Sequence, residues 1–285
     1  MACEMCGQDL GSWVGRQEQA IERLGPTPPR ALAATLDQAP QPFEDGTALP
    51  PLWHWLYFLP LQRACDIGAD GHARRGGFLP PVPLPRRMWA GSRFVFHTPL
   101  RVGDAVVRRS TIESVQPKSG RRGPLVFVTV RHELTVADAQ ALTEWHDIVY
   151  RQAPVPGEPA AQACPAPAQA QWQHTLLPDD VLLFRYSALT FNGHRIHYDR
   201  RYVTEVEGYP GLVVHGPLIA TLLLDRLHQA QPGAMLADFR FQALRPCFDG
   251  RPLQLCGRLD GAAARLWALD DGGALALQAT ATLRV

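Results

Sequence analysis

The chain has 285 residues, enough for one large domain or two ordinary ones, and its 46% hydrophobic content is typical of a globular protein. A formal net charge of +1, with 19% charged residues, gives no reason to expect a nucleic acid or a membrane surface as partner. No apolar run is long enough for a membrane-spanning helix, and the first ten residues contain Glu4 and Asp9, unlike a secretory signal. A single Cys3-x-x-Cys6 pair among irregularly spaced cysteines predicts neither a metal site nor a disulfide framework. We expect a cytoplasmic protein with reduced thiols.

The first ninety residues are predicted to be irregular and rich in aromatic side chains. Residues 9–38 are predicted to form two short helices, the first ending at Gly25-Pro26 and the second covering residues 31–36. Residues 52–59 (LWHWLYFL) are dense in aromatic side chains and are expected to be buried, at a packing surface or a pocket wall. Residues 76–85 (GGFLPPVPLP) contain too many prolines for a helix or a central strand, and this apolar loop is expected to cover another part of the molecule.

Alternating apolar residues predict two groups of strands. The first group is expected at 93–97, 104–115, 125–137 and 142–150, with a solvated hairpin tip at 118–123. A linker rich in proline and alanine follows at 151–172 and separates an N-terminal unit, 1–150, from a C-terminal unit, 173–285. In the second unit a helix is predicted at 216–229, where Gly216-Pro217 suits a helix start. Strands are then predicted at 236–244, 253–259, 263–270 and 274–285.

The two units resemble each other when the first is shifted by about 147 residues, the offset that superposes their Pro-x-x-x-Gly turns. Arg93 then falls on Arg240, and Gly103 falls on Gly250. In each unit a strand runs into the turn and then into an alternating strand. The repeated order of elements predicts an internal duplication in which each copy is a bent antiparallel sheet with a helix packed on it.

Residues 191–199 (FNGHRIHYD) and 208–218 (GYPGLVVHGPL) bring together polar and titratable side chains. They lie between two apolar runs, 181–184 and 218–224, that are predicted to form core. His197 is the main catalytic candidate, because histidine titrates near neutrality and suits proton transfer. Any one of these histidines taken alone also fits a surface loop.

These two segments resemble the MaoC-like, hot-dog-fold acyl-thioester hydratases and dehydratases. More narrowly, they are similar to the branch that includes mitochondrial-type 3-hydroxyacyl-thioester dehydratase and mesaconyl-C4-CoA (3-methylfumaryl-CoA) or itaconyl-CoA hydratase. In the first unit, residues 50–58 (PPLWHWLYF) and 75–89 (RGGFLPPVPLPRRMW) are similar to the same branch, so the resemblance covers nearly the whole chain.

The resemblance implies an α+β double hot dog, in which two curved antiparallel sheets each wrap around a central helix. Only the second unit carries the hydratase motif, so the first would be a degenerate copy that shapes the acyl pocket. The two units would form within one chain the pseudo-dimer that other family members form by pairing two chains. A monomer is therefore allowed, and a homodimer is the alternative.

The motif departs from the wider family's pattern, Asp-x-Asn-Pro-x-His, at three places. Asn192 stands where that pattern has Asp, His194 where it has Asn, and Arg195 where it has Pro; the His matches His197. Asn at the first position is typical of the narrower branch, so the motif does not indicate a dead site. An amide can orient water or an imidazole, but it cannot carry a proton.

Hydration of an enoyl thioester requires a base for water, an acid for Cα and a donor to the thioester oxygen. We predict His197 as the base, Asn192 as the group that orients the water and the Gly216 N–H as the oxyanion donor, which is also the family's donor. Asp199 is expected to cap the following turn, with orientation of His197 as the alternative; His215 is expected to be structural. The predicted substrate-binding residues are His194, Arg195, Arg86, Arg87 and Trp89, with a solvated surface position as the alternative for Arg195. No metal or cofactor is predicted.

The predicted function is a hydro-lyase acting on an acyl-CoA, with a C5 dicarboxylic substrate preferred: mesaconyl-C4-CoA or itaconyl-CoA, hydrated to citramalyl-CoA. Spare arginines suited to a second carboxylate favour this substrate. A 3-hydroxyacyl-ACP or -CoA dehydratase of fatty-acid synthesis is the first alternative, and it predicts a deep apolar tunnel. A hot-dog thioesterase and a non-catalytic acyl-CoA-binding protein are the further alternatives.

Overall fold

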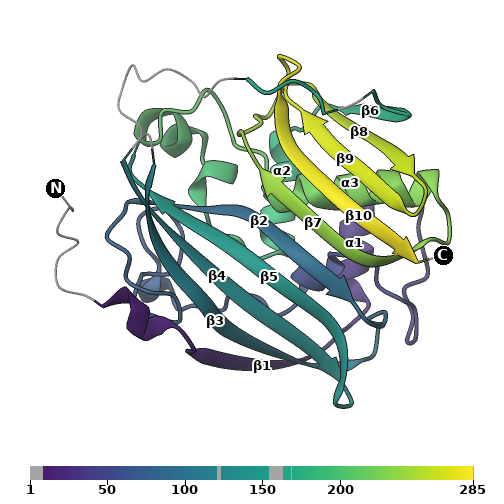
Figure 1. The fold of residues 1–285 in the computed structure, drawn as a ribbon, viewed down its shortest axis with the longest axis horizontal. Coiled ribbons are helices and arrows are strands. Elements are labelled where there is room, and N and C mark those ends of the chain that lie inside the picture. The colour runs from purple at the N-terminus through teal and green to yellow at the C-terminus, as the bar shows by residue number, and fades with distance from the viewer. Residues whose placement is uncertain (1–8, 121–122, 154–162, 168, 285) are drawn as a thin grey trace.

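The computed structural model describes residues 9–120, 123–153, 163–167 and 169–284. Ten strands form one sheet in the order β1-β3-β4-β5-β2-β7-β10-β9-β8-β6, and every neighbouring pair is antiparallel (Figure 1). The strands are β1 Gln17–Arg23, β2 Arg86–Phe96, β3 Ala105–Gly120, β4 Gly123–Val136, β5 Ala139–Arg151, β6 Trp172–Leu176, β7 Met235–Ala243, β8 Leu253–Asp260, β9 Ala263–Leu269 and β10 Leu275–Arg284.

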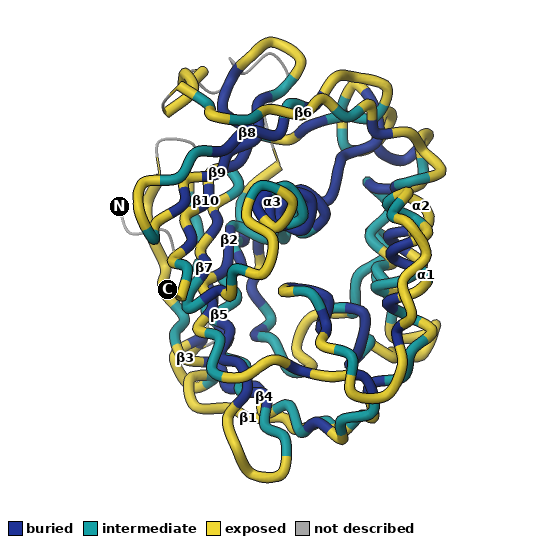
Figure 2. Tube along the Cα trace, turned by 90° about the vertical axis from the view of Figure 1, so that its right-hand side faces the viewer, coloured by how far each residue is buried: buried dark blue, intermediate teal, exposed yellow. Residues whose placement is uncertain are grey.

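Three α-helices lie on one side of this sheet: α1 (Thr27–Thr35), α2 (Asp180–Leu189) and α3 (Gly216–Ala230). Figure 2 shows α3 end-on beside the sheet, with α1 and α2 forming an outer layer beyond it. Short helical turns complete the chain at Leu10–Trp13, Trp53–Leu56, Ala64–Asp66, Arg195–His197 and Tyr202–Val206. None of the described helices is long and apolar enough to cross a membrane.

The strand order has the symmetry that the internal duplication predicts. Strands β1, β3, β4, β5 and β2 of the first half correspond in sequence to β6, β8, β9, β10 and β7 of the second. The halves join where β2 pairs with β7, and in that register Arg93 lies opposite Arg240. These are the two residues that the 147-residue shift makes equivalent, so the pseudo-twofold axis passes through this pair.

The hydrophobic core extends across the join. One cluster of buried side chains includes Phe94 of β2, Phe239 and Phe241 of β7, and most of the apolar face of α3. The rings of Phe94 and Phe239 lie 5.9 Å apart. Because the same cluster draws on both halves, neither half has a separate core beneath the join.

The two halves differ in what covers the sheet. Helix α3 packs against β8, β9 and β10 of the second half. The duplication places its counterpart at residues 69–83, which contain no helix in the described structure, so the expectation of a central helix in the first half is wrong. The aromatic segment Trp53–Leu56 covers the first-half sheet instead: the rings of Trp55 and Phe94 lie 5.9 Å apart. A short turn fills less space than a fifteen-residue helix, which leaves room for a cavity.

Three local predictions are wrong or only partly right because tertiary contacts override local patterns. The helix predicted before Gly25 is instead a short turn followed by strand β1, which pairs with β3 at the sheet edge and leaves Ile21 exposed. The proline-rich break that follows is the first turn of α1, where proline is tolerated because the N–H groups have no partners within the helix. Residues 181–184 are only partly core: Leu183 is buried, whereas Val181 and Phe184 are exposed.

The helix beginning at Gly216 and all eight predicted strands are present, with small shifts of their ends except in β2, which begins at Arg86, seven residues before the predicted strand 93–97. The apolar loop at 76–85 does cover another part of the molecule, because Val82 and Leu84 pack with Val126 and Val128 of β4. The proposed boundary at 151–172 falls where β5 ends and β6 begins; residues 154–162 and 168 lie outside the described part of the chain. The Cys3–Cys6 pair and the two residues at the hairpin tip, 121–122, also lie outside it.

Candidate active site

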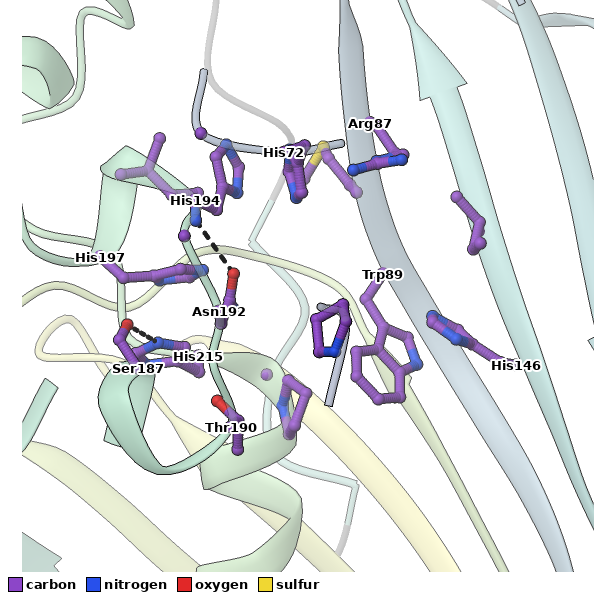
Figure 3. A pocket seen from close by; sticks show the side chains of 18 of the residues that line it. His72, Arg87, Trp89, His146, Ser187, Thr190, Asn192, His194, His197 and His215 are labelled. Atoms are coloured by element: carbon purple, nitrogen blue, oxygen red, sulfur yellow. Dashed lines mark hydrogen bonds between the residues drawn. The ribbon is translucent and has the colours of Figure 1, made fainter. Parts of the chain in front are cut away.

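A cavity of about 2270 Å³ lies between the first-half sheet, the 60–79 loop and the two motif segments. It occupies the space beside α3 that a second central helix would fill. Figure 3 shows side chains from both halves pointing into it. Of the predicted site residues it is lined by His197, Asn192, Gly216, His194, Arg86, Arg87 and Trp89. Arg195 is not among its lining residues.

His197 ends the short helical turn Arg195–His197 and is buried. Its Nδ1 lies 2.7 Å from the carbonyl oxygen of Val213, so Nδ1 carries the proton and Nε2 has a free lone pair. Burial lowers the pKa of His197 to about 4, partly opposed by the bond to Val213. The imidazole is therefore neutral at pH 7 and able to accept a proton.

His215 holds the other face of this imidazole. The rings of His197 and His215 stack with their centroids 3.7 Å apart and 16° between their planes. His215 is buried at the N-cap of α3, and its Nε2 lies 2.8 Å from the hydroxyl of Ser187 on α2. Burial holds the pKa of His215 well below its ordinary value, so the stacked pair carries no mutual charge repulsion at pH 7. His215 thus fixes the orientation of His197.

Asn192 begins the motif at the end of α2. Its Oδ1 accepts a hydrogen bond from the backbone N–H of His194 at 3.0 Å. This bond fixes the orientation of the amide and leaves the NH₂ group as the free donor of the side chain. Figure 3 shows Asn192 beside His197 at the cavity wall. A donor next to a neutral base is suited to holding a water molecule.

Helix α3 begins at Gly216, and His215, Gly216 and Pro217 all line the cavity. The first N–H groups of a helix have no acceptor within the helix, and the helix dipole makes this end partly positive. A Cβ built on Gly216 meets no atom within 4 Å, so there is open space beside its Cα. The position can therefore accept a developing negative charge on an oxygen atom.

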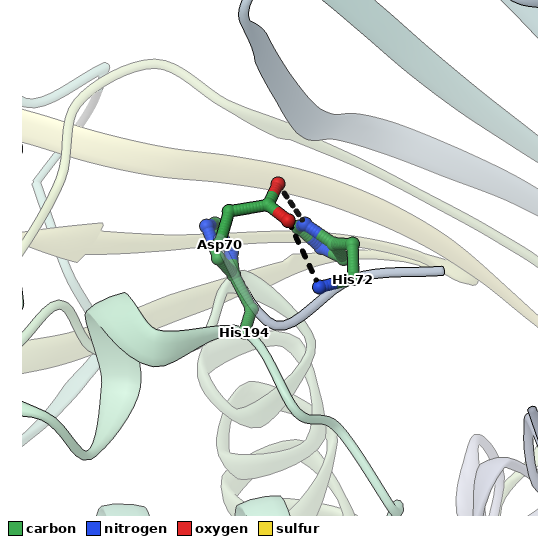
Figure 4. A group of neighbouring side chains, drawn as sticks. All are labelled: Asp70, His72 and His194. Atoms are coloured by element: carbon green, nitrogen blue, oxygen red, sulfur yellow. Dashed lines mark hydrogen bonds and ion pairs between the residues drawn. The ribbon is translucent and has the colours of Figure 1, made fainter. Parts of the chain in front are cut away.

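His194 meets a first-half loop at the wall of the cavity (Figure 4). The ring centroids of His194 and His72 are 4.0 Å apart, and Nδ1 of His72 lies 3.0 Å from Oδ2 of Asp70. Burial lowers the pKa of His194 far below its ordinary value, and His72 and His197 lower it further. The metal-ligating atoms of Asp70, His72 and His194 all lie within 4.8 Å of one another. A cation bound there would replace the Asp70–His72 hydrogen bond, which is formed in this structure.

Two of the predicted arginines are already paired. Arg86 contacts the Glu207 carboxylate at 2.7 Å and the Tyr209 hydroxyl at 3.2 Å. Arg195 contacts Asp199 at 2.7 Å, and its guanidinium lies over the ring of Tyr202. Both guanidinium groups therefore have structural contacts of their own.

Asp199 caps the following turn, because its Oδ1 accepts the N–H of Tyr202 at 3.0 Å. Its other oxygen, Oδ2, accepts from Arg195. The imidazole of His197 is oriented by the Val213 carbonyl instead.

Arg87 and Trp89 lie on β2 and line the cavity opposite the motif (Figure 3). Among the described residues Arg87 forms no ion pair with a carboxylate, and its charge contributes to lowering the pKa of His72. Trp89 stacks on His146 with ring centroids 3.9 Å apart and donates its indole N–H to Ser92 at 3.0 Å. This wall thus combines a flat aromatic surface with a cation that has no carboxylate partner there.

Below Trp89 the sheet carries a belt of buried polar groups. The Glu144 carboxylate accepts hydrogen bonds from Trp55 and Ser92 and lies 3.0 Å from Nε2 of His54. Burial alone would raise the pKa of Glu144, but its neighbours outweigh this and hold it at about 2. Burial lowers the pKa of His146 to about 4. The belt makes this end of the cavity polar.

Comparisons with known proteins identify the family of the chain. A family model described as hydroxyacyl-thioester dehydratase type 2 matches residues 52–249. The chain is 46% identical to mesaconyl-C(4)-CoA hydratase of Chloroflexus aurantiacus, covering 98% of this chain and 99% of the relative. The chain belongs to the hydroxyacyl-thioester dehydratase type 2 family.

Solved structures confirm the fold of this dehydratase family member. A MaoC-like dehydratase from Phytophthora capsici superposes with a TM-score of 0.69 at 13% identity, over 95% of this chain and 96% of the other. A conserved hypothetical protein from Mycobacterium tuberculosis, described as a double hotdog fold, superposes with a TM-score of 0.54 at 15% identity, over 95% and 96%. The predicted double hot dog, family and hydro-lyase class are confirmed.

Several residues of this family member's site were not found by sequence reasoning. Asp70 and His72 are the main examples; their only signal is a short Asp-Gly-His turn in a loop without regular structure. His215 was assigned a structural role, and the stacking on His197 shows what it supports. In the sequence Glu144 and His146 resemble ordinary strand residues, because an alternating pattern does not indicate that the buried face of a strand is polar.

Proposed function

We propose that the protein is a hydro-lyase that reversibly adds water to an α,β-unsaturated acyl-CoA with a C5 dicarboxylic acyl group. The preferred substrate is mesaconyl-C4-CoA, and its hydrated product is citramalyl-CoA; itaconyl-CoA, whose double bond lies between Cβ and Cγ, is the alternative source of the same product. The observation that carries this proposal is the 46% identity, over nearly the full length of both chains, to a mesaconyl-C(4)-CoA hydratase.

The lining of the cavity supports a small polar acyl group. A charged carboxylate cannot be buried without a partner, and Arg87 offers a guanidinium that no carboxylate of the described residues occupies. The floor beyond it carries His132, Glu144 and His146. A long alkyl chain would need an apolar tunnel there, because polar groups lose hydrogen bonds to water without gaining others.

In the proposed mechanism His197 activates water. Its Nε2 removes a proton from a water molecule held by the Asn192 NH₂ group, and the hydroxide adds to Cβ of the enoyl thioester. Val213 and His215 keep the imidazole in the required tautomer and orientation. Asn192 carries no proton in this step, because its amide does not titrate.

The electron pair of the double bond moves towards the thioester as the hydroxide adds, so the carbonyl oxygen gains negative charge. The Gly216 N–H at the start of α3 donates to this oxygen, a contribution typically worth ~10²–10³ in rate. The imidazolium of His197 then returns its proton to Cα, which gives the 3-hydroxyacyl thioester and restores the neutral base.

The second candidate is dehydration of a 3-hydroxyacyl thioester of fatty-acid synthesis, which is the same chemistry in reverse. The family model that matches the chain carries that description. The two candidates differ in the acyl group and can be separated by substrate preference alone.

The test is a turnover panel with mesaconyl-C4-CoA, itaconyl-CoA, crotonyl-CoA and trans-2-octenoyl-CoA. We expect kcat/KM for a dicarboxylic substrate to exceed that for crotonyl-CoA by about one to two decades, the usual value of a charge-assisted hydrogen bond. Equal or better activity on crotonyl-CoA or octenoyl-CoA would support the fatty-acid dehydratase instead. Release of free thiol would indicate a thioesterase, and binding without turnover an acyl-CoA-binding protein.

A further inference from the structure

The turn carrying Asp70, Gly71 and His72 is fastened to the catalytic motif. The backbone N–H of Arg195 donates to the Asp70 carbonyl at 2.9 Å. Gly71 has a φ of +87°, and a Cβ built on it would lie 1.7 Å from the Gly193 carbonyl oxygen, so only glycine allows this approach. The first half thus places His72 against His194 with no space between the two backbones.

Asp70 sets the orientation of His72. Its carboxylate accepts hydrogen bonds from the backbone N–H and the ring Nδ1 of His72, both at 3.0 Å. Burial alone would raise the pKa of Asp70, but the bonds from His72 outweigh it and hold the carboxyl ionised. With Nδ1–H bonded to Asp70, Nε2 is the free nitrogen of His72, which lines the cavity.

The free ring nitrogen of His72 lies in a mainly cationic setting. The charged and titratable groups around His72 are Asp70, Arg75, Arg87, His194 and His197. The guanidinium of Arg75 donates hydrogen bonds to the backbone carbonyls of Val82 and Pro85, at 2.6 and 2.7 Å. Arg87 has no carboxylate partner among the described residues. An anion between His72 and Arg87 would therefore meet one imidazole and one guanidinium that contacts Tyr150 but no carboxylate of the described residues.

The chemistry of the substrate places a carboxylate at this wall. In mesaconyl-C4-CoA the free carboxylate is attached to Cβ, the carbon that water attacks. The carboxylate carbon must therefore lie one bond away from Cβ, which faces His197 and Asn192 in the proposed mechanism. His194 connects these groups to His72, since its ring centroid is 5.4 Å from that of His197 and 4.0 Å from that of His72.

We propose that His72, oriented by Asp70, and Arg87 form the binding site for the carboxylate on Cβ, and that His72 takes up a proton when this carboxylate binds. The proposal rests on the dicarboxylic substrate proposed above. A neutral Nε2 presents a lone pair, which repels an anion. Protonation converts it to a donor, and the resulting imidazolium bridges the carboxylates of Asp70 and the substrate.

Proton uptake gives the binding of dicarboxylic substrates a defined pH dependence. Burial lowers the pKa of His72 in the free protein, and its bond to Asp70 only partly offsets this. A bound carboxylate raises that pKa. Affinity for a dicarboxylic acyl-CoA is therefore highest at low pH and falls by up to about tenfold per pH unit between the free and the bound pKa. A monocarboxylic acyl-CoA lacks this dependence.

The kinetic test compares His72→Gln and Arg87→Gln on mesaconyl-C4-CoA and crotonyl-CoA. We expect KM for mesaconyl-C4-CoA to rise at least about tenfold in each variant, with a much smaller change for crotonyl-CoA. Arg93→Gln is the matched control for Arg87, because Arg93 lies on the same strand, is exposed and does not line the cavity. His228→Gln, at an exposed position in the last turn of α3, is the control for His72. Equal losses on both substrates would overturn the assignment.

The calorimetric test does not depend on turnover. Succinyl-CoA carries its carboxylate on Cβ and cannot be hydrated, and butyryl-CoA is its neutral counterpart. Titration in two buffers of different ionisation enthalpy should show uptake of about one proton for succinyl-CoA, none for butyryl-CoA, and none for succinyl-CoA with His72→Gln. Uptake that persists in His72→Gln, or no uptake in the parent protein, would overturn the inference. If the parent protein instead favours crotonyl-CoA in the turnover panel, the proposed function fails separately.

Discussion

At the scale of single residues, the candidate site combines a neutral base with a donor that cannot titrate. His197 is deprotonated at pH 7 because burial outweighs its bond to Val213, and it is held between that carbonyl and the ring of His215. Asn192 is oriented by the backbone of His194. This arrangement assigns the whole proton transfer to one side chain.

The first prediction follows from this division of labour. His197→Ala should lower kcat by at least ~10², the usual contribution of a general acid–base group, while the far-ultraviolet circular dichroism spectrum is unchanged. Asn192→Asp, which restores the residue of the wider family, should keep measurable turnover with a shifted pH profile. More than about a tenth of the parent activity in His197→Ala would contradict the assignment of the base.

At the scale of secondary-structure elements, the N-terminus of α3 is the element that connects fold and chemistry. Its first turn forms the cavity wall, and its apolar face fills the second-half core. Residues 69–83, the described counterpart of α3 in the first half, contain no helix, which leaves space for the cavity. A single helix therefore supplies both the core of one half and the proposed oxyanion donor.

The second prediction distinguishes the loss of the Gly216 N–H donor from the steric effect of adding a side chain at this position. Gly216→Ala keeps the N–H, and its Cβ has room, so we expect kcat within about threefold of the parent protein. Gly216→Pro removes the N–H and should lower kcat by ~10²–10³. Helix α1 already accommodates Pro28 and Pro29 in its first turn, so a Pro-Pro start is compatible with a helix in this chain. Equal activity of the two variants would exclude this N–H as the donor.

At the scale of the whole molecule, the two halves depend on each other. The sheet is continuous through β2 and β7, one core crosses the join, and the site takes Asn192 and His197 from one half and His72 and Arg87 from the other. The candidate site therefore draws on both halves of the chain. The same arrangement buries several imidazoles, which makes the free energy of unfolding depend on pH.

The third prediction concerns acid stability. Burial lowers the pKa of His132 to about 3 and the pKa values of His146 and His197 to about 4. A buried neutral imidazole stabilises the fold fully above its unfolded pKa of about 6.5, and this contribution is lost as the pH falls towards the folded pKa, by about 1.4 kcal/mol per unit. We therefore expect Tm, measured by calorimetry, to fall steadily from pH 6.5 to 4.5.

The matched variants for this experiment are His197→Gln, which should flatten the profile, and His228→Gln, which should not. A Tm that stays constant between pH 7 and 5 would show that these imidazoles do not titrate with unfolding.

The sequence by itself determined eight of the ten described strands, the duplication, the motif and the hydration chemistry, because these depend on local periodicity and on residues close together in the chain. An alternating pattern of apolar residues indicates a strand wherever one face of the strand is buried. Asn192, His197 and Gly216 lie in two motif segments that are close together in the sequence. The same local reasoning gave a helix in place of β1, since only pairing with β3 decides how that short segment folds.

The tertiary structure alone decided what the first half contributes to the site. Asp70 and His72 are distant in sequence from His194, and the close backbone contact between Gly71 and Gly193 brings them together. The fold also distinguishes two adjacent arginines of β2: Arg86 contacts the carboxylate of Glu207, which is distant in sequence, whereas Arg87 has no carboxylate partner among the described residues. Whether a charged side chain is free or paired depends on contacts made across the fold, and these are set by packing and not by local sequence.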